Sequence, residues 1–153
     1  MLRAWRIVKK RHAEAAFDGE GARLYGGRWN SPGVSAVYTS DSRALATLEV
    51  LAGLQTSSPL SAYVLIPAEF DDSLVVAVEL EKLPADWNQN PPTPSTQRIG
   101  DDWISSGKSV VLRVPSALVP QESNYLFNPR HPDFSAVTVG KPEPLSLHSR
   151  LLR

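Results

Sequence analysis

Cysteine is absent from this sequence, and its absence excludes both disulfide bonds and metal sites built on thiolates. A net charge is absent as well, because 16 Lys and Arg residues balance 16 Asp and Glu residues. A neutral chain offers no basic surface for nucleic acid and no polybasic signal for a membrane. We therefore expect no direct nucleic-acid binding, and a nuclease is disfavoured.

Long apolar runs are also missing. No stretch approaches the roughly 20 apolar residues that a membrane-spanning helix needs, and the N-terminal segment MLRAWRIVKKRH is too polar for a signal peptide. We expect a cytoplasmic protein that does not enter a membrane. The 153 residues show no internal repeat and predict a single domain spanning residues 1–153.

Short apolar segments rich in β-branched and aromatic residues predict mainly strands. Two segments have a helical period instead: one begins after Ser40 or Asp41 and ends at Gly53, and the other begins after Ser95 and ends at Gly107. Strands are expected at residues 2–8, 35–39, 61–66, 74–78, 110–114, 134–140 and 145–152, with 122–129 as a loop or a short strand. Because helices do not alternate regularly with strands, the class is α+β.

Glycine is concentrated early in the chain, at positions 19, 21, 26, 27 and 33. Glycine permits positive φ angles and lets a ligand approach the backbone closely. The segment around residues 17–33 is therefore expected to be either a network of turns or a surface that holds a ligand. Arg28 lies within it.

The first predicted helix places a carboxylate at the edge of its apolar face. Leu45, Leu48 and Ala52 share that face, and Glu49 lies beside it rather than on the opposite, solvated side. A carboxylate in this position is partly desolvated, which is unfavourable unless another group pairs with it. Glu49 is thus a candidate functional residue, although an ordinary glutamate of a helix surface is the alternative.

Three segments together resemble a known family. They are GGRWNSPG, VYTSDSRALATLEVL and VPSALVPQESNYLFNPRHPDF. In this order and spacing they resemble the RES domain, the toxin half of bacterial RES–Xre toxin–antitoxin pairs. The arginine, glutamate and serine that give the family its name match Arg28, Glu49 and Ser116. The resemblance runs from Leu2 to about Leu151, with departures at Gly53 and His148.

This resemblance implies a fold like that of ADP-ribosyltransferases, with a split mixed β-sheet around a cleft for NAD. It implies an enzyme that consumes NAD by hydrolysis or phosphorolysis of the nicotinamide–ribose bond, or by ADP-ribosyl transfer. NAD would be the substrate, and no metal or other cofactor is expected. The implied partner is an Xre-type antitoxin protein that occludes the active site.

Charge and hydrogen bonding favour particular roles for the matched residues. Cleavage of the glycosidic bond builds positive charge on the ribose, which the carboxylate of Glu49 can stabilise. Guanidinium groups suit the pyrophosphate of NAD, so Arg28 is expected to act in catalysis and binding, with Arg6 as a second phosphate contact. The alternative for Arg28 is a surface ion pair with Asp18 or Glu20, and the alternative for Arg6 is a strand-end arginine in solvent.

Tyr38 and Ser116 complete the candidate site. Tyr38 offers a ring and a hydroxyl for catalysis or for binding NAD, unless it is only a core residue of its strand. Ser116 could bind a phosphate or a ribose hydroxyl, unless it is only a turn residue. The histidines His12, His131 and His148 show no spacing typical of a metal site.

Two other functions remain open from the sequence. ADP-ribosyl transfer to a protein uses the same residues and differs only in the acceptor. A non-catalytic module that binds a nucleotide or a partner protein would keep the glycine-rich loop and use Glu49 structurally. The Trp and Leu content also leaves room for a homodimer face without locating one.

Overall fold

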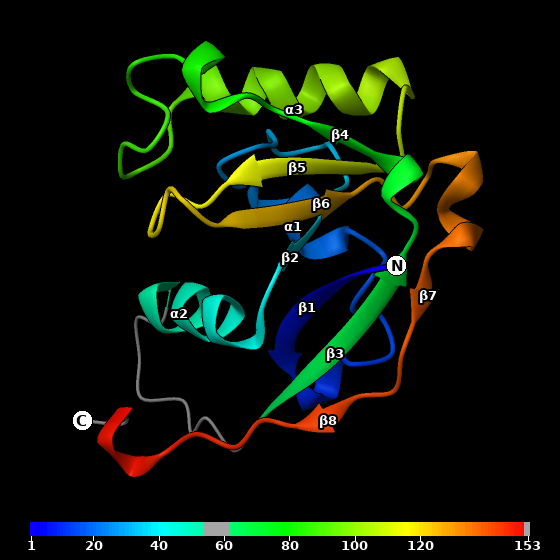
Figure 1. Cartoon of the computed structure of the whole chain (residues 1–153), viewed down its shortest axis with the longest axis vertical. Coiled ribbons are helices and arrows are strands. Elements are labelled where there is room, and N and C mark those ends of the chain that lie inside the picture. The colour runs from blue at the N-terminus through cyan, green and yellow to red at the C-terminus, as the bar shows by residue number, and fades with distance from the viewer. Residues whose placement is uncertain (54–61, 152–153) are drawn as a thin grey trace.

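The computed structural model describes residues 1–53 and 62–151 (Figure 1). Its strands are β1 (Leu2–Lys9), β2 (Val37–Ser40), β3 (Tyr63–Phe70), β4 (Val75–Ala77), β5 (Val111–Pro115), β6 (Ser123–Phe127), β7 (Thr138–Val139) and β8 (Glu143–Pro144). Its α-helices are α1 (Glu20–Tyr25), α2 (Arg43–Gly53) and α3 (Pro94–Ser106). Within the described ranges, no helix has the length and apolar character required to cross a membrane.

The strands form one mixed sheet that is split near its middle. Their order is β4-β5-β6-β2-β1-β3-β7, with β8 also paired to β3, and only β4 and β5 are parallel among these described pairs. The ladder between β1 and β2 consists of one register pair, Trp5↔Ser40. Figure 1 shows β5 and β6 running across the direction of β1 and β3. The predicted α+β class with a split mixed sheet is confirmed.

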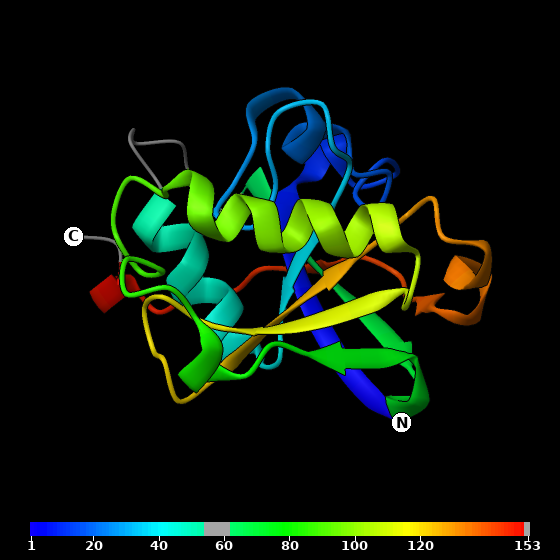
Figure 2. The same ribbon diagram turned by 90° about the horizontal axis from the view of Figure 1, so that it is seen from above.

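The core is built on both faces of β6. Successive side chains of a strand point to opposite faces, so Leu126 joins the cluster beneath α3 with Trp103, while Tyr125 and Phe127 join the other cluster. The ring of Phe70 lies edge-on, 5.2 Å from each of these two aromatic rings, and each such pair contributes about 0.5–1.5 kcal/mol. Figures 1 and 2 show α3 covering the β5–β6 part of the sheet. The segment predicted as a loop or short strand is therefore a central strand.

Helix α2 forms where the apolar period predicts it, but its cap differs. The N-terminal cap is Ser42, whose Oγ accepts a hydrogen bond from the backbone N–H of Leu45 at 3.0 Å. Ser40 is still part of β2, and the backbone N–H of Asp41 donates to the carbonyl oxygen of Ser123. The prediction of Ser40 or Asp41 as the cap was wrong because both residues are still bonded to β6.

Helix α3 also forms as predicted, but it begins at Pro94 instead of after Ser95. Thr93 occupies the cap position, and Pro94 begins the helix, where a missing N–H costs nothing. Ser95 does not cap the helix, since its Oγ donates to Asp86 Oδ1 at 2.7 Å. At the other end, Gly107 adopts a left-handed φ of 62° and ends the helix as expected.

The glycine-rich segment contains a short helix, which its high glycine content does not predict. Helix α1 follows Gly19, whose φ of 76° is left-handed, and it includes Gly21, which lowers helix propensity. Asn30 holds the segment together, because its Nδ2 donates to the carbonyl oxygens of Ala22 at 2.8 Å and Val34 at 2.9 Å. The segment is thus an ordered turn network around a short helix.

The last two predicted strands are largely wrong. A 3₁₀ helix, η5 (Pro132–Ala136), occupies the start of the segment 134–140, and only two residues of that segment form β7. Residues 145–148 form no strand, and Leu152 lies outside the described residues. The leucines of this segment line an apolar groove against α2 together with Leu48 and Leu51. Leu145 and Leu147 are partly buried and Ser146 and His148 are exposed, so the alternation arises here without pairing in a sheet.

Asp101 ties α3 to the glycine-rich loop and offers a test of this packing. Its Oδ1 accepts from the backbone N–H of Ser31 at 2.9 Å, and its Oδ2 accepts from Ser31 Oγ. Asp101→Asn makes both bonds neutral and forces the hydroxyl of Ser31 to turn and accept from the new amide N–H, so we expect a loss of about 1 kcal/mol in the free energy of unfolding in urea. Asp102→Asn, at an exposed neighbour, is the control. Equal midpoints for both variants would contradict this role.

Candidate active site

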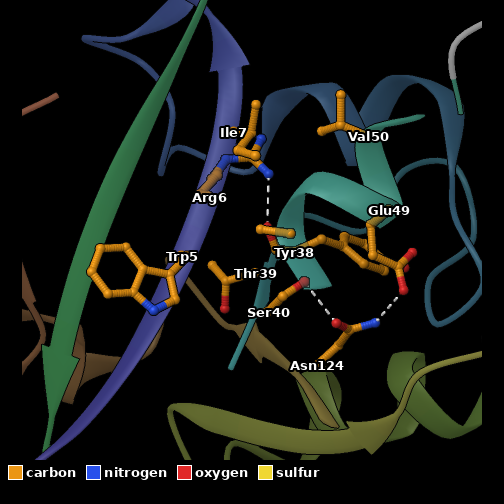
Figure 3. Close-up of a pocket in the computed structure, with 10 residues that line it drawn as sticks. Trp5, Arg6, Ile7, Tyr38, Thr39, Ser40, Glu49, Val50 and Asn124 are labelled. Atoms are coloured by element: carbon orange, nitrogen blue, oxygen red, sulfur yellow. Dashed lines mark hydrogen bonds between the residues drawn. The ribbon is translucent and has the colours of Figure 1, made fainter. Parts of the chain in front are cut away.

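Glu49 lies half-buried on α2, and its two carboxylate oxygens have different surroundings. Oε1 accepts hydrogen bonds from Ser116 Oγ at 2.8 Å and from Asn124 Nδ2 at 3.0 Å. No residue of the described ranges donates to Oε2. The carboxylate is therefore held by one oxygen while the other remains available to a ligand (Figure 3).

Ser116 is fully buried at the exit of β5, and its hydroxyl is fixed by its neighbours. Its Oγ accepts from the backbone N–H groups of Leu118 at 3.1 Å and Val119 at 3.2 Å. Because those bonds occupy the lone pairs, the hydroxyl hydrogen is directed to Glu49. The structure thus places Ser116 against the carboxylate, and its predicted contact with NAD stays a prediction.

Asn124 is a site residue that the sequence reasoning missed. It lies on β6 directly opposite Ser40 of β2, and its side chain donates to Glu49. The sequence predicts only a loop or a short strand for this segment. An asparagine two residues before an apolar pair carries no local signal of a site. Only the pairing of β2 with β6 reveals the position.

Tyr38 separates two parts of the cleft, and its hydroxyl is already fully used. The hydroxyl donates to Asn30 Oδ1 at 2.7 Å and accepts from the backbone N–H of Trp29 at 2.9 Å. Burial raises the pKa of Tyr38 far above its ordinary value, so the phenol stays protonated. What Tyr38 presents to the cavity is therefore its ring.

This contact explains the glycine before Arg28. A Cβ on Gly27 would lie 2.6 Å from the hydroxyl oxygen of Tyr38, closer than real atoms come. The absence of a side chain lets the loop approach the tyrosine and hold Arg28 at the cleft. The glycine is thus required by close approach, as the composition of the loop indicated.

Arg28 is anchored by a loop from the other side of the cleft. Its Nη1 donates to the carbonyl oxygens of Trp87 at 3.0 Å and Gln89 at 2.8 Å. Burial lowers the pKa of Arg28, and the charge of Glu49 partly offsets that effect. No described residue pairs with its Nε or Nη2, and the ion pair with Glu20 is made by Arg23 instead. One edge of the guanidinium is therefore free.

Arg6 emerges from β1 and joins the two halves of the molecule. Its Nε donates to the carbonyl oxygen of Ala16 at 2.5 Å, and its Nη1 donates to that of Tyr38 at 2.9 Å. Burial lowers the pKa of Arg6 to about 10, with Asp18 acting in the opposite direction. Arg6 is thus partly buried and bonded to backbone, unlike the alternative of a solvated strand end.

The side chains described above line two adjoining hollows. The larger, of about 360 Å³, is lined by Arg28 and Glu49, and the smaller, of about 170 Å³, is lined by Arg6. Tyr38, Glu49 and Asn124 line both. The structure thus places Glu49 and Arg28 on one cavity, while Ser116 does not line it. The two guanidinium groups can bind an anionic substrate. The carboxylate between them can stabilise positive charge that develops at the reacting atom of that substrate.

Comparison with known proteins agrees with this geometry. The RES domain family matches residues 3–148. A protein named "Toxin Res" from Yersinia enterocolitica is 41% identical over 142 residues, covering 93% of each chain. A protein named "Prs ADP-ribosylating toxin" from Sphingobium sp. is 36% identical over 155 residues, covering 97% of this chain and 96% of the other.

A solved structure shows the same fold. It is the M. tuberculosis MbcT–MbcA toxin–antitoxin complex, one chain of which superposes with a TM-score of 0.78 at 21% identity. The match covers 95% of this chain and 84% of that one. Together with the sequence matches over nearly the whole length, it leads to one conclusion: this chain belongs to the RES domain family.

Proposed function

We propose that this protein is the toxin of a toxin–antitoxin pair and that it consumes NAD by cleaving the nicotinamide–ribose bond. The observation that carries the proposal is the free oxygen of Glu49, which faces a cavity that Arg28 also lines. The toxin names of relatives at 36% and 41% identity support it. The proposed reaction uses NAD as substrate and needs no metal.

The chemistry follows from the charge of the site. The bond between ribose C1′ and the nicotinamide nitrogen breaks with its electron pair on nitrogen, which converts the pyridinium into neutral nicotinamide. Positive charge then develops on the ribose, and the Oε2 of Glu49 stabilises it. The acceptor oxygen bonds to C1′ and loses its proton, for which the same carboxylate is a suitable base.

The guanidinium groups explain selection of a dinucleotide. Pyrophosphate oxygens suit the free Nε–Nη2 edge of Arg28, because a planar fork can donate two parallel hydrogen bonds. Nη1 is already held by two carbonyl groups, so less side-chain freedom is lost when phosphate binds. Arg6 lines the adjoining hollow and supplies a second positive charge.

The acceptor distinguishes three versions of this reaction. Water gives ADP-ribose, inorganic phosphate gives its 1″-phosphate, and a protein side chain gives an ADP-ribosylated protein. The name of the Sphingobium relative favours the third version. All three release nicotinamide, which separates them from a non-catalytic module that binds NAD without turnover.

We further propose that an Xre-type antitoxin occludes this cavity and that the pair acts in the cytoplasm. The structural neighbour comes from a toxin–antitoxin complex, which supports a protein partner of this class. An inhibitor that fills the cavity needs acidic groups for the two arginines. We expect such a partner to compete with NAD.

The decisive experiment is a time course of NAD and its products by mass spectrometry. Purified protein, freed of any partner, is incubated with NAD in water, with phosphate, and with cell lysate. Release of nicotinamide supports the proposal, and the second product identifies the acceptor. If NAD remains intact with all three, the proposed function is wrong.

Substitution of Arg28 tests the phosphate contact. Loss of charge-assisted hydrogen bonds worth about 1.5–3 kcal/mol should lower kcat/KM for NAD in Arg28→Ala by roughly 10- to 100-fold, mainly through KM. Arg28→Lys keeps the charge without the fork and should recover only part of the loss. Arg98→Ala, on the exposed side of α3, is the control. An unchanged KM in Arg28→Ala would rule out this contact.

A further inference from the structure

A chain of three side chains leads from the sheet to the carboxylate of Glu49. Ser40 Oγ donates to Asn124 Oδ1 at 2.8 Å, and Asn124 Nδ2 donates to Glu49 Oε1 at 3.0 Å (Figure 3). Ser40 is buried, with 3% of its surface exposed. Ser40 lies within the segment VYTSDSRALATLEVL but was given no role there, and its hydroxyl bonds to no other side chain in the described ranges.

The direction of this chain is set by charge. A side-chain amide can face either way, but a reversed Asn124 would turn its carbonyl oxygen toward the carboxylate of Glu49. The hydroxyl of Ser40 stabilises the other orientation by donating to that carbonyl oxygen. The amide N–H of Asn124 is then fixed toward Glu49.

The place of Ser40 in the sheet makes it a rigid anchor. Its backbone pairs with Asn124 of β6 on one side and with Trp5 of β1 on the other. That second pair is the one register pair of the ladder between β1 and β2. A hydroxyl placed there has a fixed position relative to both halves of the sheet.

We propose that Ser40 is a positioning residue that acts on Glu49 through Asn124. With Asn124 fixed, Oε1 of Glu49 is held by two donors and Oε2 is aimed into the cavity. Without Ser40, Asn124 can rotate, Oε1 loses a donor, and the carboxylate can turn away from the reacting carbon. This inference rests on the proposed function for its effect on rate, but not for its effect on Asn124.

Ser40→Ala is the first test. Loss of one neutral hydrogen bond of about 1 kcal/mol should lower kcat for NAD cleavage about five-fold, with KM within about two-fold. Ser40→Thr restores a hydroxyl and should recover rate. Ser35→Ala is the matched control, because Ser35 is also a buried serine and its hydroxyl has no partner in the described part of the chain.

A double-mutant cycle tests whether Ser40 acts through Asn124. In an Asn124→Ala background, adding Ser40→Ala should cause no further loss of kcat, because the side chain it orients is gone. Additive losses would overturn the relay. Equal kcat for wild type, Ser40→Ala and Ser35→Ala would overturn it as well.

A second readout does not depend on turnover. The side-chain amide protons of Asn124 can be followed by nuclear magnetic resonance, and Ser40→Ala should shift them while Ser35→Ala should not. Unchanged amide resonances in Ser40→Ala would contradict the inference whatever the activity. If wild type leaves NAD intact while these resonances shift as expected, the proposed function fails and the positioning role stands.

Discussion

Replacing Glu49 with glutamine is expected to reduce NAD cleavage by on the order of 1,000-fold, or about 4 kcal/mol of transition-state stabilisation. Glutamine has the shape of glutamate, and its carbonyl oxygen can still accept from Ser116 and Asn124. The variant therefore keeps the hydrogen bonds that hold the side chain and loses only the negative charge. Nicotinamide release and growth arrest on induced expression should both be lost.

The design separates loss of charge from loss of fold. Glu14→Gln makes the same chemical change at an exposed position and should cleave NAD like wild type. Urea unfolding should give Glu49→Gln a midpoint close to that of wild type. A folded Glu49→Gln variant with wild-type turnover would show that this carboxylate does not take part in the reaction.

Gly100→Ala is expected to cause the largest loss of stability among these variants. A Cβ on Gly100 would lie 1.6 Å from the carbonyl oxygen of Trp29 and 2.7 Å from its carbonyl carbon. Both atoms belong to the backbone, so the helix and the loop must separate. Overpacking of this kind costs about 3 kcal/mol or more, which exceeds the roughly 1 kcal/mol that alanine gains over glycine within a helix.

The measurement is the free energy of unfolding in urea, followed by NAD cleavage. Gly21→Ala in α1 is the control, since its Cβ would meet nothing within 4 Å and the variant should be neutral or slightly stabilised. Because Trp29 adjoins Arg28, the rise in KM that we predict for Arg28→Ala should also appear in Gly100→Ala. Stability equal to wild type would mean that α3 and the loop are packed less closely than described.

The local sequence predicted the helices and strands that their own residues favour. The β-branched residues of β5 and the apolar period of α2 and α3 specify those elements without help from distant residues. The alternating leucines after β8 mislead because alternation shows only that one side of a segment is less exposed: Leu145 and Leu147 line a groove beside α2 and pair with no strand. The cap of α2 at Ser42 depends on how far β2 continues, which only its pairing with β6 decides.

The charged residues of the site could be predicted from the sequence. The surroundings of Arg28 and Glu49 in the sequence made them candidates, the resemblance to the RES domain favoured a site over an ordinary surface role, and the structure brings them to one cavity. Asn124 and Ser40 were not candidates, because their contact depends on the register of strands 84 residues apart. The burial of Ser116 behind Glu49 likewise depends on how the turn after β5 folds.

The position of β6 in the sheet bears on when activity can arise during synthesis. This strand lies between β2 and β5, although its residues 123–127 come late in the chain. A ribosome-bound chain can have Arg28 and Glu49 outside the ribosome before β6 has been made. Such a chain still lacks the strand that joins β2 to β5. Asn124 is missing from it as well. On the proposed function, a chain that lacks β6 is therefore expected to leave NAD intact, because Asn124 cannot yet hold Glu49.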